Sequence, residues 1–182
     1  MLNYRLVSFY CRCNPKGGGV AIYVKNNADF QMSEISNIKL ISVDKVLEVC
    51  AVDISISGRK LKVITFYRSP EPAYVNDFFV KLYDVLSRIC RNCRDVVIIS
   101  GDFNVDRLVD SDEKFELQNI LRNFNIEILS NEPTRITPTS ATCLDGIFTE
   151  TSKIKSYTHF VDHNGLADHS GQILRCQLRV NS

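Results

Sequence analysis

Residues 96–104 constrain the fold of this chain more than any other stretch. Four β-branched apolar residues at positions 96–99 are followed by Ser100 and then by Gly-Asp-Phe-Asn. A short, continuous apolar run of this kind is typical of a strand buried on both faces. The Gly-Asp-Phe-Asn segment has two interpretations. It is a polar site at the end of the strand, or it is a turn, because Gly, Asp and Asn are common turn residues.

The composition is that of an ordinary globular protein. A length of 182 residues predicts a single domain over residues 1–182, and 45% hydrophobic and 24% charged residues are enough to build one core. The net charge of +1 gives no general attraction to nucleic acid, so contact with a polyanion must be local. No apolar run reaches the roughly 20 residues of a membrane helix, and the N-terminus lacks the order of a signal peptide. We therefore expect an intracellular protein with no membrane partner.

The seven cysteines predict free thiols. Their number is odd and no signal peptide precedes them, which argues against a disulfide framework. A zinc site could combine Cys11 and Cys13 with Cys90 and Cys93, but these pairs lie far apart and have no regular ligand spacing. We expect thiols in the core or on the surface instead.

The pattern of apolar residues predicts many strands and two helices. Strands are expected at residues 4–10, 20–24, 46–56, 60–67, 96–100, 126–129, 144–149, 154–161 and 170–180, and helices at 75–91 and 113–124. Ser111 or Asp112 is the expected N-cap of the second helix, and residues 131–142 are expected to form a polar loop. Many hairpins and few helices indicate an α+β fold, with two sheets face to face and helices outside.

A glycine-rich segment, Lys16-Gly17-Gly18-Gly19, separates the first two predicted strands. Glycine loops can hold phosphate when a helix follows them. Here a strand follows, so the segment is interpreted as the turn of a β-hairpin.

Four polar groups lie at or just after the ends of predicted strands. They are Tyr67-Arg68, Asp102 with Asn104, Asp145, and Asp168-His169. Carboxylates bind hard cations such as Mg²⁺, a histidine moves protons or contacts phosphate, and tyrosine and arginine bind phosphate oxygens. Each group also has an ordinary structural explanation, such as a turn at Asp145-Gly146. Together and in this order they favour phosphodiester hydrolysis, whereas His159 and His163 are expected to be structural or solvated.

The same motifs resemble those of the endonuclease/exonuclease/phosphatase superfamily. The resemblance rests on Gly-Asp-Phe-Asn at 101–104, Leu-Asp-Gly-Ile-Phe at 144–148 and Ala-Asp-His at 167–169. The glycine segment with the strand after it, and Tyr-Arg-Ser-Pro at 67–70, look like the apurinic-endonuclease-like domain of non-LTR retrotransposon pol-like proteins. This resemblance covers nearly the whole chain and implies a DNase I-like, two-sheet α/β sandwich.

The resemblance also implies a role for each matching residue. Asp102 and Asn104 would orient the attacking water and the scissile phosphate, and Asp168 would bind the metal together with Asp102. The cofactor would be Mg²⁺ or Mn²⁺. The substrate would be DNA, nicked to leave a 3′-hydroxyl that primes reverse transcription.

On the phosphate side, the resemblance implies contacts from His169, Tyr67, Arg68 and Asn104. Asp145 would hold the imidazole of His169. The partner would be the reverse-transcriptase domain of the parent element, and the location would be the nucleus.

Two departures from the family pattern lead to alternative functions. Ala167 stands where the family usually has serine. The family's first strand, helix and second strand, which carries a metal-binding glutamate, are expected to be missing, and neither Glu34 nor Glu48 lies in the matching context. The missing glutamate segment makes a catalytically impaired remnant, which binds nucleic acid or another partner, the first alternative, whereas Ala167 removes a hydroxyl but no metal ligand. A phosphatase of the same superfamily is the second alternative.

Overall fold

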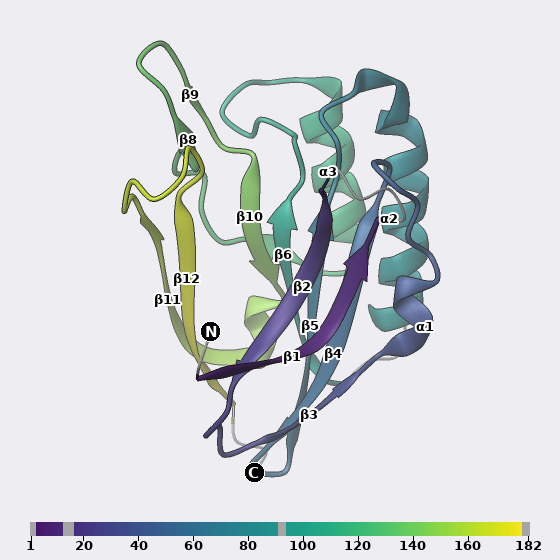
Figure 1. The fold of residues 1–182 in the computed structure, drawn as a ribbon, viewed down its shortest axis with the longest axis vertical. Helices are drawn as coiled ribbons and strands as arrows, with labels where there is room; N and C mark the ends of the chain where they lie inside the picture. The colour runs from purple at the N-terminus through teal and green to yellow at the C-terminus, as the bar shows by residue number, and fades with distance from the viewer. Residues whose placement is uncertain (1–2, 13–16, 91–93, 180–182) are drawn as a thin grey trace.

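The computed structural model describes residues 3–12, 17–90 and 94–179, and its centre is a six-stranded mixed sheet (Figure 1). The elements are β1 (Tyr4–Cys11), β2 (Gly19–Lys25), β3 (Gln31–Glu34), α1 (Ser36–Lys39), β4 (Glu48–Ile56), β5 (Arg59–Tyr67), η1 (Pro72–Tyr74), α2 (Val75–Cys90), β6 (Val96–Asp102), α3 (Asp112–Asn123), β7 (Glu127–Ile128), β8 (Arg135–Ile136), β9 (Ala141–Thr142), β10 (Asp145–Thr149), η2 (Thr151–Lys153), β11 (Ile154–Asp162) and β12 (Gly171–Leu178). The strand order of the large sheet is β3-β4-β5-β6-β10-β7. Only β5 and β6 run parallel within it, joined by α2, and the other neighbours are antiparallel.

The main core lies between this sheet and the two long helices. The inward face of α2 presents Phe78, Leu82 and Leu86, all with no exposed surface, and α3 adds Leu117. These side chains share one cluster with Ile64, Phe66, Val97 and Ile99 of the sheet, with further buried residues around them. Helical spacing of the apolar residues on α2 therefore does what the sequence predicts, because one face of the helix covers β5 and β6.

The opposite face of the sheet is covered by a second, divided layer. Strand β4 is buried on both sides. Val49 and Ala51 belong to the cluster under the helices, whereas the thiol of buried Cys50 donates to Ser8 O of β1 at 3.6 Å. The β1–β2 hairpin packs on β4 and β5 through such contacts, and β11 and β12 form a separate two-stranded ribbon. Figure 1 shows that ribbon on the side away from the helices.

Most predicted elements are confirmed, with differences at their ends. Ser111 is the N-cap of α3, and its side chain accepts from Lys114 N at 3.2 Å. Strand β4 begins at Glu48 and not at residue 46, because Leu47 pairs with Val43 in a tight turn. The expected polar loop at 131–142 instead contains the small β8–β9 hairpin, closed where Thr137 N donates to Ser140 O at 2.8 Å.

Elements between residues 26 and 45 were not predicted. The short strand β3 pairs with the edge of β4, and α1 follows it with a single buried residue, Ile38. Neither is long enough to produce a clear apolar period. No helix in the described residues is long and apolar enough to cross a membrane.

The thiol prediction is confirmed for the five cysteines that the structure describes. Cys11, Cys50, Cys90, Cys143 and Cys176 are thiols outside any disulfide, and none belongs to a cluster of possible metal ligands within the described ranges. The remaining expectations about Cys13, Lys16, Arg91, Cys93 and Val180 lie outside the described residues.

Removing a core side chain from α2 tests this packing. We expect Leu82→Ala to lower the free energy of unfolding by about 2–5 kcal/mol, because it leaves a cavity beneath the sheet. Val80→Ala, on the exposed face of the same helix, is the control, with an expected change within about 0.5 kcal/mol. Urea unfolding followed by circular dichroism measures both. Equal losses in the two variants would contradict the assigned inward face.

Candidate active site

Four polar residues form one row across the ends of four neighbouring strands of the large sheet. The register pairs Glu48 with Tyr67, Tyr67 with Asp102, and Asp102 with Asp145. Each of the four is the first or last residue of its strand. Because directly paired residues project to the same face, the row places these side chains side by side at one end of β4, β5, β6 and β10.

The segment after β6 bends sharply beyond Asp102. Asn104 has a positive φ of 48°, and its backbone N–H donates to Asp102 Oδ1 at 3.0 Å. This is the Asx-type turn that the residue types predict, so the turn and the site are the same structure and not alternatives. Gly101 also has a positive φ, and a Cβ there would lie 2.0 Å from Phe66 O on the neighbouring strand. Only glycine permits this close approach of β6 to β5.

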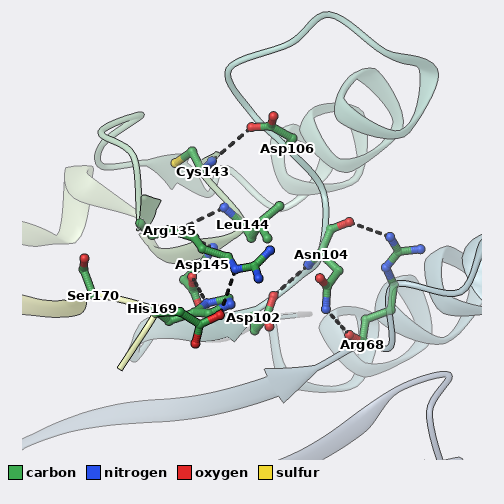
Figure 2. Close-up of polar contacts among 12 residues, drawn as sticks. Arg68, Asp102, Asn104, Asp106, Arg135, Cys143, Leu144, Asp145, His169 and Ser170 are labelled. Atoms are coloured by element: carbon green, nitrogen blue, oxygen red, sulfur yellow. Dashed lines mark hydrogen bonds and ion pairs between the residues drawn. The ribbon is translucent and has the colours of Figure 1, made fainter. Parts of the chain in front are cut away.

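The side chain of Arg68 stabilises this bend. Its side chain is almost fully buried, and its Nε and Nη2 donate to Phe103 O and Asn104 O at 2.8 and 2.6 Å. Asn104 Nδ2 in turn donates to Arg68 O at 2.6 Å (Figure 2). Glu113 of α3 pairs with the guanidinium at 3.1 Å. The side chain thus braces the turn of Asn104, and its expected contact with phosphate stays a prediction.

The histidine reaches the row from a distant part of the chain. His169 Nδ1 lies 2.8 Å from Asp145 Oδ2, although the two residues are 24 positions apart. Thr134 Oγ1 accepts from the backbone N–H of Asp145 at 3.1 Å, and Arg135 forms a β-bridge with His169. The β8–β9 segment therefore ties the start of β10 to the histidine loop, as Figure 2 shows.

Asp168 precedes His169 in the chain and pairs with Arg135. Its side chain is 62% exposed and accepts from Arg135 Nε at 3.0 Å. This hydrogen bond lowers the pKa of the Asp168 carboxyl, since it favours the charged form. Asp102 shows the opposite effect. Burial, and after it the charge of Asp145, raise the pKa of Asp102, and the Asn104 N–H, His169 and Arg68 offset this only in part.

The donor set at the edge of the sheet fits a divalent cation. Asp102, Asp145 and His169 each offer a ligand atom, and these atoms lie within 4.8 Å of one another. Carboxylate oxygens are the ligands that Mg²⁺ and Mn²⁺ prefer in proteins. The raised pKa of Asp102 indicates a carboxylate short of positive charge, which a cation would supply. Asp168 is not part of this group among the described residues, and its predicted metal role stays a prediction.

A second buried arginine, which the sequence did not single out, supports Asp145. Arg107 is 3% exposed, its Nη2 donates to Asp145 O and contacts Cys143 Sγ, and its guanidinium lies 5.3 Å from the ring centre of Phe148. Burial lowers its pKa. From the sequence, an arginine three residues after Asn104 is expected to be a solvated loop residue. Only its packing in the structure shows that it supports Asp145.

Comparison with known proteins agrees with this geometry. The family described as endonuclease-reverse transcriptase matches residues 61–173, which is more than half of the chain. No curated protein matches at a significant level. The endonuclease domain of TRAS1, a telomere-specific non-LTR retrotransposon, has a TM-score of 0.72 at 16% identity, over 98% of this chain and 81% of that one.

Two other solved structures share the fold. An endonuclease/exonuclease/phosphatase family protein from Leptotrichia buccalis gives a TM-score of 0.67 at 16% identity, over 97% of this chain and 72% of that one. D. rerio TDP2 complexed with a single-strand DNA product gives 0.61 at 15% identity, over 98% and 78%. The expected sandwich is thus a DNase I-like mixed α/β fold, while the expected lack of a first strand-helix-strand segment stays a prediction. From the matched residues and this fold, the chain belongs to the endonuclease-reverse transcriptase family, within the endonuclease/exonuclease/phosphatase superfamily.

Proposed function

We propose that this chain hydrolyses phosphodiester bonds with a divalent cation and nicks DNA. The observation that carries the proposal is the group of Asp102, Asp145 and His169, whose ligand atoms lie within 4.8 Å of one another at the edge of the sheet. Tyr67 stands next to Asp102 in the same row, and Asn104 follows it in the turn. Carboxylates, a histidine, an amide and a phenol in this arrangement suit attack of water on a phosphate.

The residues divide the work by their contacts. Asp145 holds His169 by its Nδ1, which leaves Nε2 to contact a phosphate oxygen. Asp102 accepts from the backbone N–H of Asn104, and together these two residues orient the attacking water and the phosphate. The hydroxyl of Tyr67 donates a hydrogen bond to the phosphate. Arg68 contributes to phosphate binding by holding Asn104 in position. We retain Asp168 as a further metal-site residue.

Asp102 and Asp145 would hold Mg²⁺ or Mn²⁺. When bound, such an ion neutralises charge on the phosphate and lowers the pKa of a coordinated water. Its charge would also offset the burial of Asp102 and, after it, the charge of Asp145, which together raise the pKa of Asp102.

DNA is the substrate that the family favours. The TRAS1 domain is the endonuclease of a retrotransposon, and TDP2 was solved with a single-strand DNA product. We therefore propose target-DNA nicking by a domain spanning 1–182, in a nuclear protein that works with the reverse-transcriptase domain of its element. A phosphatase activity and a non-cutting remnant are the two outcomes that would replace this proposal.

Nicking of supercoiled plasmid in Mg²⁺ tests the proposed reaction. We expect the wild type to nick, and His169→Ala to lower the rate about 10²- to 10⁴-fold because the phosphate contact is lost. His159→Ala is the matched control, since His159 bonds to Gln172 on the β11–β12 ribbon away from the row. Nicking that survives His169→Ala would contradict the assignment. Release of phosphate from a monoester without nicking would favour a phosphatase, and DNA binding without either reaction would favour the remnant.

Stability as a function of pH tests the environment of Asp102. A raised folded-state pKa means that the folded protein holds the proton more tightly than the unfolded chain does. Ionisation of Asp102 therefore destabilises the fold, and this loss develops as pH rises from the unfolded pKa through the raised folded one.

In EDTA at pH 7 we thus expect Asp102→Asn to be more stable than the wild type, with the difference shrinking below about pH 4. Urea midpoints at both pH values measure it. Equal midpoints at pH 7 would mean that burial and the charge of Asp145 do not make the ionised Asp102 destabilising.

Cation binding should reverse the order of stability. A ligand that binds only the folded state adds about 2.7 kcal/mol at a hundred times its Kd. We expect Mg²⁺ or Mn²⁺ to raise the Tm of the wild type and to have little effect on Asp102→Asn. Asp162→Asn, which removes an exposed carboxylate at the end of β11, should respond as the wild type does. A Tm that does not change with either ion would remove the metal from the proposal.

A further inference from the structure

Gly17 and Gly18, which precede β2, lie against the side chain of an arginine. Arg12 directly follows β1, and its guanidinium lies against Gly18, where a Cβ would be 2.2 Å from Arg12 Cζ. Arg12 Nη1 donates to Gly17 O at 3.3 Å. Gly17 also has a positive φ, but a Cβ there would meet nothing within 4 Å. A side chain at Gly18 would therefore displace the Arg12 guanidinium from its present position, whereas a side chain at Gly17 would not.

Arg12 compensates a buried carboxylate. Glu48, the first residue of the row, has no exposed surface, and its Oε1 accepts from Arg12 Nε and from Lys45 N at 2.9 Å. Its Oε2 has no hydrogen-bond partner in the described residues. A buried carboxylate without a counter-ion is strongly unfavourable, so the fold depends on Arg12 at this point. The hydrogen bond to Glu48 raises the pKa of Arg12, which stays charged.

The same guanidinium covers the ring of Tyr67. Arg12 Cζ lies 5.3 Å from the centre of that ring, within the range of a cation–π contact. Glu48 and Tyr67 are directly opposite in the β4–β5 register, and Tyr67 is opposite Asp102. Arg12 therefore contacts both Glu48 and Tyr67, and the Tyr67 side chain connects this group to the proposed active site.

We propose that Arg12 is a positioning residue for Tyr67, held in place by the glycine turn. It packs on one face of the ring, so that the hydroxyl stays in the row beside Asp102. It also cancels the charge of Glu48, which would otherwise repel a phosphate approaching Tyr67. A planar guanidinium can pair with the carboxylate and stack on the ring at once, which a lysine cannot do equally well. The functional part of this inference rests on the proposed nicking activity.

Two glycine variants separate the contact with Arg12 from the effect of a side chain at positive φ. Gly17→Ala and Gly18→Ala both place a side chain at positive φ, but only the Gly18 variant pushes into Arg12. We expect Gly18→Ala and Arg12→Met to shift the ring resonances of Tyr67 in proton–carbon NMR spectra, identified by their loss in Tyr67→Phe. Gly17→Ala, and Arg5→Met in the strand that precedes Arg12, should leave them in place. Unshifted Tyr67 resonances in Arg12→Met would overturn the proposal whether or not the protein nicks DNA.

Kinetics tests the functional part. We expect Arg12→Met to lower kcat about 10- to 100-fold, with Arg12→Lys recovering only part of it. In the Tyr67→Phe background Arg12→Met should cause no further loss, whereas an equal loss there would show that Arg12 does not act through the phenol. Arg12→Met combined with Glu48→Gln serves if the single variant does not fold. If Arg12→Met shifts the Tyr67 resonances but the wild type does not nick DNA, the positioning of Tyr67 is supported and the nicking activity is refuted.

Discussion

The parallel pairing of β5 with β6 is the contact on which the rest of the structure depends. It needs α2 as its crossover, and α2 in turn supplies the side chains that bury the sheet on one face. The same pairing sets Tyr67 beside Asp102, and it requires Gly101 because β6 comes so close to Phe66 O. Core and candidate site therefore share one set of backbone hydrogen bonds.

Buried arginines connect the strand ends to one another. Arg68 donates to the carbonyls of Phe103 and Asn104, while Arg107 donates to that of Asp145. Arg12 repeats the pattern at Glu48, although there it pairs with a carboxylate. Each guanidinium has several donors in a fixed plane, so it can hold irregular backbone that no strand pairing reaches. The positive φ of Asn104 persists because the surrounding contacts determine it.

The sequence predicted what is local and periodic. The helical face of α2, the N-cap Ser111 and the strand β12 all follow from spacing and residue type. The burial of the Arg68 side chain could not be predicted in this way, because nothing in the local sequence distinguishes a buried arginine from a solvated one. The same holds for the hairpin at β8–β9, which depends on distant contacts of Thr134 with the start of β10.

The row of strand ends also has a consequence for how such a domain can diverge. A residue inserted within β5 or β6 would turn every later side chain of that strand to the opposite face, and Tyr67 or Asp102 would leave the row. A residue inserted between strands would leave the register intact. Changes in length should therefore collect in the connections, such as those on either side of α3, while the strands keep their length. A fold held in this way can keep its strand register at the 16% identity shared with the TRAS1 domain.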